Sequence, residues 1–190
     1  MIQSLAAIVR RVDGWIETAL HWDRRAVHRV ADLPFLRRCA RMFITATYLG
    51  DGYLWGGLGL GLILFGETAD RIHVLIGVAI TIVNMAIFRL LKVLIGRMRP
   101  IHDLPRLRSR IVDGYSFPSG HATTSVGLAG VVARSYPILW VQIAIFVVAA
   151  TISFSRVYVR EHYPLDVLGG AILGSLVAFF LYPPLAGIFL

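Results

Sequence analysis

The sequence is poor in charge and in cysteine, and both shortages restrict the class of protein. Only 16% of its 190 residues are charged, whereas 57% are hydrophobic and the mean hydropathy is +0.71. Ordinary soluble domains carry about 25% charged residues, so this composition indicates an integral membrane protein. The single cysteine, Cys39, cannot form an intramolecular disulfide or a multi-cysteine zinc site.

Lysine is almost absent, although the chain is strongly basic. There are 19 Lys and Arg residues against 11 Asp and Glu, which gives a net charge of +8, and the only lysine is Lys92. Nucleic acid is one class of anion that such a charge attracts. The basic residues lie in short loops between apolar segments, however, where lipid headgroups are the nearer anions. We therefore expect a bilayer as partner and no nucleic acid.

The sequence also has no internal repeat, low-complexity tract or long linker. The first apolar run, SLAAIV, is stopped by two arginines, which is unlike a cleaved signal peptide. Over residues 2–22 apolar residues recur at spacings of three and four, which predicts an amphipathic helix in the membrane interface. These residues are Leu5, Val9, Val12, Ile16 and Leu20. Residues 23–41 are expected to be a basic connection, so residues 1–41 and 42–190 are the two predicted units.

Five apolar segments follow, each near the ~20 residues that cross a bilayer. We place them at about 43–66, 72–96, 119–136, 138–158 and 165–188. Glycine pairs on the first and last, at positions 57 and 61 and positions 170 and 174, predict close helix packing. Counting the crossings brings residues 97–117, the start of the third span, the end of the fourth and the start of the fifth to one membrane face.

The first charged cluster at this face is RLLKVLIGRMRP, residues 89–100. If the second span stays helical to about Met98, Arg89, Lys92 and Arg99 share one stripe of that helix. The stripe can bind an anion. An isolated cluster of this kind is more typical of a positive flank that anchors a helix end.

The second cluster is YSFPSGHATTS, residues 115–125. Ser119 and Gly120 begin a span, and a helix N-terminus offers free N–H groups and partial positive charge to a phosphate. His121, in the first turn, can give a proton to a leaving oxygen. A serine-capped helix start beside an incidental histidine is an equally good interpretation.

The third cluster is SRVYVREHYPLD, residues 155–166. His162 and Asp166 are four residues apart, so the carboxylate can fix the imidazole tautomer and prepare a nucleophile. Arg156 faces the same region and can hold phosphate oxygens with its planar fork. Taken alone, a histidine beside a carboxylate is more often an ordinary hydrogen-bonded pair. All three clusters together supply what phosphoryl transfer needs.

The three clusters resemble the signature of the type 2 phosphatidic acid phosphatase superfamily, which is K-x6-R-P, P-S-G-H and S-R-x5-H-x3-D. Every position of the signature is matched by Lys92, Arg99, Pro100, Pro118, Ser119, Gly120, His121, Ser155, Arg156, His162 and Asp166. The resemblance implies an all-α integral membrane bundle. It also implies a lipid phosphatase with its site near the headgroups.

The resemblance further implies that His162 attacks phosphorus to form a phosphohistidine, which water then hydrolyses. Asp166 would orient His162, and His121 would protonate the departing oxygen. The implied phosphate-binding residues are Lys92, Arg99, Ser119, Gly120 and Arg156. No metal or other cofactor is implied.

The superfamily also contains soluble haloperoxidases and sugar phosphatases. Five spans argue against the first, and the small size and interfacial helix favour a lipid phosphate over a sugar. Phosphatidic acid or phosphatidylglycerophosphate is the first choice, followed by undecaprenyl pyrophosphate or lipid A. A lipid phosphotransferase with the same site is a further alternative. A non-catalytic lipid-binding protein is another, although binding alone needs no oriented nucleophile.

Two further expectations concern orientation and the remaining charges. All Lys and Arg except Arg71 and Arg134 fall on the active-site face. The positive-inside rule therefore places that face in the cytoplasm of a bacterial inner membrane, although many relatives work on the outer face. Asp51, within the first span, is expected to pair with a cation such as Arg89 or Lys92 or to stay protonated. In the loop between the first two clusters, charges that can contact a headgroup or remain solvated are Arg106, Arg108 and Arg110.

Overall fold

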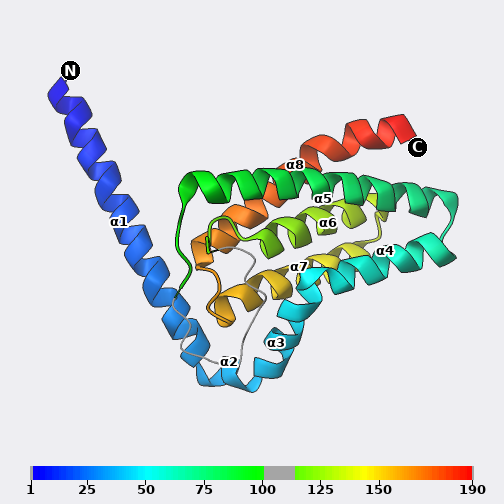
Figure 1. The fold of residues 1–190 in the computed structure, drawn as a ribbon, viewed down its shortest axis with the longest axis horizontal. Helices are drawn as coiled ribbons and strands as arrows, with labels where there is room; N and C mark the ends of the chain where they lie inside the picture. Colours follow the sequence, from blue (N-terminus) through cyan, green and yellow to red (C-terminus); the bar gives the residue numbers. More distant parts are fainter. Residues whose placement is uncertain (1, 101–113, 190) are drawn as a thin grey trace.

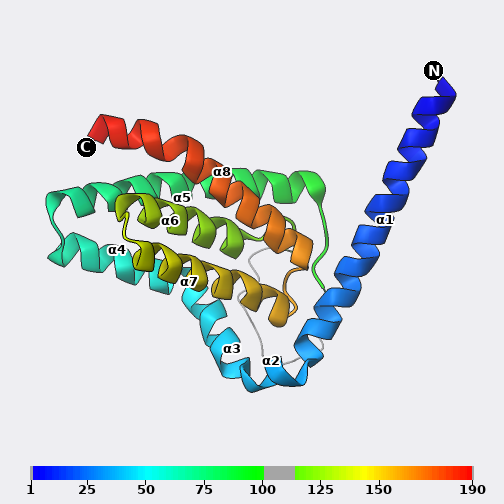
Figure 2. The same ribbon diagram turned by 180° about the vertical axis from the view of Figure 1, so that it is seen from behind.

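The computed structural model describes residues 2–100 and 114–189, apart from the side chains of residues 2–12 and of Ala31. The described part is helical, which confirms the all-α prediction. Its elements are α1 (Ile2–Asp32), α2 (Pro34–Arg38), α3 (Ala40–Tyr48), the π-helical turn η1 (Leu49–Tyr53), α4 (Leu54–Phe65), α5 (Thr68–Ile95), α6 (Gly120–Ser135), α7 (Leu139–Tyr158) and α8 (Pro164–Phe189). Helices α4 to α8 form a bundle, and α1 projects away from one end of it (Figures 1 and 2).

Three helices of the described chain are long and apolar enough to cross a membrane, namely α5, α7 and α8. Many apolar side chains of α5 are exposed, as expected for a surface that faces lipid. The five predicted spans are thus confirmed only in part. Helix α6, which corresponds to the third predicted span, has only 16 residues and is shorter than the ~20 residues that cross a bilayer. The first predicted span is divided into α3 and α4 by η1, where Gly52 adopts a φ of 113° that a helix cannot continue through.

Helix α5 has clear signals at both ends. At its start, the Glu67 backbone N–H donates to Asp70 Oδ2 at 2.8 Å, as part of a capping box. At its end, Gly96 takes the left-handed conformation with a φ of 62°. The expected continuation to Met98 is therefore wrong. Arg99 lies beyond the helix and does not share a helical stripe with Lys92.

Helix α6 lies in the centre of the bundle, packed against α5, α7 and α8. Gly170 and Gly174 of α8 lie against the backbone of α6, where an added Cβ would overlap Ser119 or Thr123. This confirms the close packing predicted for that glycine pair. The pair in the first span behaves differently, because a Cβ at Gly57 or Gly61 would meet no atom of the described chain within 4 Å.

Helix α1 is longer than predicted. It continues through the expected basic connection to Asp32, because residues 23–32 contain neither glycine nor proline and Pro34 comes only two residues after the helix end. The predicted apolar stripe through Leu5, Val9 and Val12 lies outside the described side chains. Most of the described side chains of α1 are exposed, but Asp23 and Val27 are completely buried against the end of the bundle.

Candidate active site

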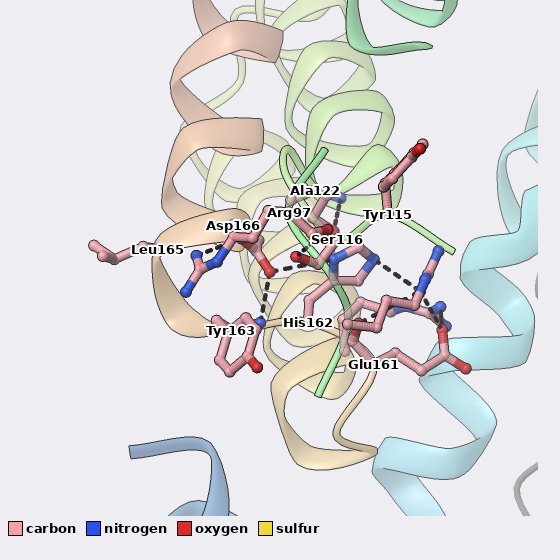
Figure 3. Close-up of polar contacts among 12 residues, drawn as sticks. Arg97, Tyr115, Ser116, Ala122, Glu161, His162, Tyr163, Leu165 and Asp166 are labelled. Carbon is pink, nitrogen blue, oxygen red and sulfur yellow. Dashed lines mark hydrogen bonds and ion pairs between the residues drawn. The ribbon is translucent and has the colours of Figure 1, made fainter. Parts of the chain in front are cut away.

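The end of the bundle nearest α1 holds the candidate nucleophile, His162, in the short connection from α7 to α8 (Figure 3). Its side chain is only 2% exposed. Nδ1 faces Asp166 Oδ2 at 3.7 Å, and Nε2 lies 3.5 Å from Nη1 of Arg99. Asp166 is fixed in turn, since its Oδ2 accepts a hydrogen bond from the Tyr163 backbone N–H at 2.8 Å. One imidazole nitrogen thus faces the carboxylate and the other faces a cation.

The surroundings keep His162 neutral. Burial lowers its pKa well below the ordinary value of 6.5, and the neighbouring positive charges of Arg156 and Arg99, then of Lys92 and His121, lower it further. A neutral imidazole has a free lone pair. The pKa shift therefore suits His162 to nucleophilic attack near neutral pH.

Two signature cations, Arg156 and Lys92, are buried beside this histidine. Arg156, in the last turn of α7, donates from Nη1 to Thr47 Oγ1 at 2.6 Å. Its Nε is buried and has no hydrogen-bond partner within the described residues, so it can bind a further oxygen. Lys92 donates from Nζ to the Tyr115 carbonyl at 2.7 Å, which attaches α5 to the segment before α6.

A residue that the sequence analysis missed, Glu161, lies between the signature arginines. Its side chain is 2% exposed, and its carboxylate forms ion pairs with Arg99 at 3.4 Å and with Arg156. In the close-up, Glu161 and His162 lie side by side at the same end of the bundle (Figure 3). The only signal in the sequence was the density of charge around His162, because nothing local shows which way a glutamate points.

Ser119 and Gly120 occupy the predicted helix start. Ser119 is the N-cap of α6, accepts from the Ala122 N–H at 3.5 Å and donates its own backbone N–H to the Asp166 carbonyl at 2.9 Å. A Cβ at Gly120 would come within 3.1 Å of the Phe88 ring, so this glycine allows α5 and α6 to approach. The hydrogen bond from Ser119 to Asp166 thus ties the start of α6 to the first turn of α8.

His121, in the first turn of α6, pairs with Asp51, the acid of the first predicted span. Its Nε2 lies 2.8 Å from Oδ1 of Asp51. One partner that the structure shows for Asp51 is thus a histidine, which the sequence analysis did not anticipate. The turn η1 makes the contact possible, because it bends the chain where Gly50 packs against the imidazole.

Arg97 and Asp23 are the other site residues that the sequence did not reveal. Arg97 contacts Asp166, and Asp23 of α1 contacts Arg97. Of the remaining cations that the sequence analysis named, Arg89 is exposed on α5. Arg106, Arg108 and Arg110 lie outside the described residues.

The arrangement combines a buried neutral imidazole, the guanidinium of Arg99 beside its Nε2, the buried guanidinium of Arg156, and a second histidine with its own carboxylate. Guanidinium forks match the oxygens of a phosphate. The site can therefore hold a tetrahedral anion against Nε2 of His162. Such an arrangement suits attack on phosphorus better than simple binding, because it contains an oriented nucleophile.

Proteins of known sequence support this description. The lipid A 4'-phosphatase of Bacteroides thetaiotaomicron is 35% identical over 57% of this chain and 52% of its own length. The undecaprenyl-diphosphatase of Sulfolobus acidocaldarius is 33% identical over 68% of this chain and 63% of its own. Phosphatidylglycerophosphatase B of Bacillus subtilis is 32% identical over 64% and 61%, respectively. The chain thus spans between about half and two thirds of the length of these relatives.

Solved structures are similar over more of the chain. A transmembrane phosphatidylglycerolphosphate phosphatase of the PAP2 type from Bacillus subtilis has a TM-score of 0.69 and 26% identity, over 90% of this chain and 88% of its own. LpxE of Aquifex aeolicus shares the fold, with a TM-score of 0.62 and 23% identity over 83% of this chain and 92% of its own. The sequence model of the PAP2 superfamily matches residues 73–185, which carry all three signature clusters. The chain therefore belongs to the PAP2 superfamily.

Proposed function

We propose that this protein is a membrane lipid phosphatase that hydrolyses a phosphomonoester or pyrophosphate through a phosphohistidine on His162. One observation carries the proposal. Nδ1 of His162 faces Asp166, while Nε2 lies 3.5 Å from the Arg99 guanidinium, where a bound phosphate would be within reach of attack.

The proposed reaction has two steps. In the first, Nε2 of His162 attacks phosphorus, the bond from phosphorus to the lipid oxygen breaks, and His121 gives its proton to that oxygen. In the second, water attacks the phosphohistidine, the P–N bond breaks and His121 takes up the proton that water releases. Lys92, Arg99 and Arg156 stabilise the charge on the transferring phosphoryl group in both steps.

A lipid is the favoured substrate because an apolar cavity begins beside the proposed general acid. The cavity has a volume of about 460 Å³ and lies between α4, α5 and α6. Gly52 and Thr124 contribute to its lining, next to Asp51 and one turn after His121. Its wall is largely apolar, with residues such as Trp55, Leu60, Val78, Leu128 and Val131. A cavity of this size and composition suits a hydrocarbon chain rather than a sugar.

We place phosphatidic acid or phosphatidylglycerophosphate first among substrates. Support comes from the phosphatidylglycerolphosphate phosphatase structure, which resembles 90% of this chain. Undecaprenyl pyrophosphate and lipid A are the second candidates. The undecaprenyl-diphosphatase and the lipid A 4'-phosphatase described above are 33% and 35% identical to this chain over the matched regions, respectively.

The test is phosphate release from a panel of detergent-solubilised lipid phosphates and pyrophosphates, in the presence of EDTA. Wild type, His162→Ala and a matched surface variant, His28→Ala, are assayed side by side. We expect release by wild type and His28→Ala and none by His162→Ala, and the order of rates across the panel names the substrate. Full activity of His162→Ala would refute the phosphohistidine. Release that requires an added alcohol would instead identify a phosphotransferase.

A further inference from the structure

Arg97 bridges two buried carboxylates that are far apart in the sequence. Its Nη1 lies 2.7 Å from Oδ1 of Asp166, and its Nη2 lies 2.6 Å from Oδ2 of Asp23. Both carboxylates are completely buried, whereas the Arg97 side chain is 17% exposed. The guanidinium also stacks over the Tyr163 ring, 4.1 Å from its centroid. Its position is thus fixed on three sides.

Asp23 makes a second contact with the same part of the site. Its Oδ1 accepts a hydrogen bond from the Leu165 backbone N–H at 2.9 Å. Leu165 lies in the first turn of α8, immediately before Asp166. A carboxylate at a helix N-terminus is stabilised by the free N–H groups and the helix dipole. Asp23 therefore holds both the arginine that contacts Asp166 and the backbone that carries it.

These contacts determine how Asp166 faces the nucleophile. With Oδ1 held by Arg97, the carboxylate turns Oδ2 towards the Tyr163 N–H and Nδ1 of His162. Without Arg97, the Tyr163 N–H would still hold Oδ2, but Oδ1 would lose its ion pair and rotation about the Cβ–Cγ bond would be less restrained. The tautomer and direction of His162 would then be fixed less firmly.

The burial of Asp23 is hard to explain by anchoring alone. Helix α1 is otherwise exposed along most of its described length, and burying a charged carboxylate is costly unless it is paired. A helix that only rested on lipid would not need an acid directed into the bundle. The end of α1 is attached at a second point, where Arg160 lies 3.5 Å from Asp32.

We propose that Arg97 and Asp23 are positioning residues for phosphoryl transfer, through which α1 holds Asp166 in register with His162. Helix α1 is thereby part of the catalytic apparatus as well as a candidate membrane anchor. This inference rests on the proposed phosphohistidine reaction, because it assigns the two residues to the orientation of its nucleophile.

The first test compares Asp23→Asn with Glu17→Gln, which neutralises an exposed acid on the same helix. Each full-length variant is assayed on the lipid that the wild type hydrolyses. For Asp23→Asn we expect kcat to fall by about 10²-fold, as displaced catalytic groups do, with little change in KM. Glu17→Gln should match the wild type. An unchanged kcat in Asp23→Asn, or a rise in KM alone, would overturn the inference.

The second test separates positioning from simple stability. Arg97→Lys keeps the charge but loses the fork that bridges both carboxylates, so it should retain more activity than Arg97→Met and less than wild type. An asparagine at position 23 can still accept the hydrogen bond from the Leu165 N–H, so both changes remove the same contact between Arg97 and Asp23. The double variant Asp23→Asn/Arg97→Met should therefore lose no more kcat than Arg97→Met alone. Additive losses, or a fully active Arg97→Lys, would argue against positioning even if Asp23→Asn failed to fold.

The assay of the wild type separates failure of the proposed function from failure of this positioning inference. If the wild type releases phosphate from no lipid, the proposed function and this inference both fail. If the wild type is active and Asp23→Asn is equally active, only the inference fails.

Discussion

His121 and Asp51 come from separate helical segments, yet Nε2 of the histidine lies 2.8 Å from Oδ1 of the carboxylate. The site therefore contains a second imidazole and carboxylate pair beside His162 and Asp166. A carboxylate beside an imidazole can fix the orientation of the ring, which a general acid needs if it is to direct a proton at the leaving oxygen.

The pairing predicts that Asp51→Asn affects leaving groups unequally. Hydrolysis of a lipid phosphate, whose alkoxide needs a proton, should fall by about 10²-fold, in line with general acid catalysis. Hydrolysis of an activated aryl phosphate should change little, and His121→Ala should show the same selectivity. The measurement is kcat for both substrates in each variant. Equal losses on both substrates would show that His121 does not act as the general acid.

The position of Glu161 predicts that its carboxylate competes with a bound phosphate for the guanidinium groups of Arg99 and Arg156. Because its side chain is buried against Arg99 and Arg156, it shares the groups that would bind the anion. In Glu161→Gln we expect inhibition by inorganic phosphate to become stronger by about tenfold, which corresponds to about 1.4 kcal/mol. Inhibition constants in the wild type and the variant test this. A weaker inhibition would mean that Glu161 mainly holds the two arginines in place.

The lowered pKa of His162 predicts its protonation state in the substrate-free enzyme. Burial and the nearby cations favour the neutral ring, so His162 should stay neutral as the pH falls through 6.5, where an ordinary histidine gains its proton. Nitrogen NMR of histidine-labelled protein would follow the titration, and His162→Ala would identify the signal. The prediction fails if the signal that His162→Ala removes titrates at or above that pH.

Packing between α6 and α8 predicts a difference between two glycines. A Cβ at Gly174 would overlap the Thr123 carbonyl and come within 3.0 Å of the Gly127 nitrogen. Gly174→Ala should therefore destabilise the protein by about 1–3 kcal/mol, as overpacking does. Gly61→Ala is the matched control, because its Cβ meets no described atom within 4 Å. Unfolding midpoints in detergent would test this, and equal midpoints would refute it.

Orientation in the membrane is predicted by the distribution of arginine. If the active-site face is cytoplasmic, Cys39, which is partly exposed near the start of α3, should resist an impermeant thiol reagent in intact cells. It should become labelled once the cells are permeabilised. Efficient labelling of intact cells would place the site on the outer face and favour undecaprenyl pyrophosphate or lipid A as substrate.

The sequence by itself determined the helical class and most of the candidate chemistry. Long apolar runs require helices in a bilayer because every backbone group must be hydrogen-bonded. His162, Asp166 and His121 could be named because their chemistry depends on residue type and short spacing. The sequence also predicted the tight packing at Gly174, since small residues at a four-residue spacing mark one helix face.

Only the tertiary structure decided the partners of those residues. The contacts of Arg97 with Asp23 and of Asp51 with His121 join residues 74 and 70 positions apart, respectively, so no local pattern could predict them. Helix α5 ends at Gly96 because this glycine adopts the left-handed conformation, and the first predicted span breaks at η1 because Gly52 adopts a positive φ. Side-chain direction at Glu161 followed from where the arginines lay. Identity and spacing specified the candidate reactive groups, whereas packing between distant helices specified how those groups are held.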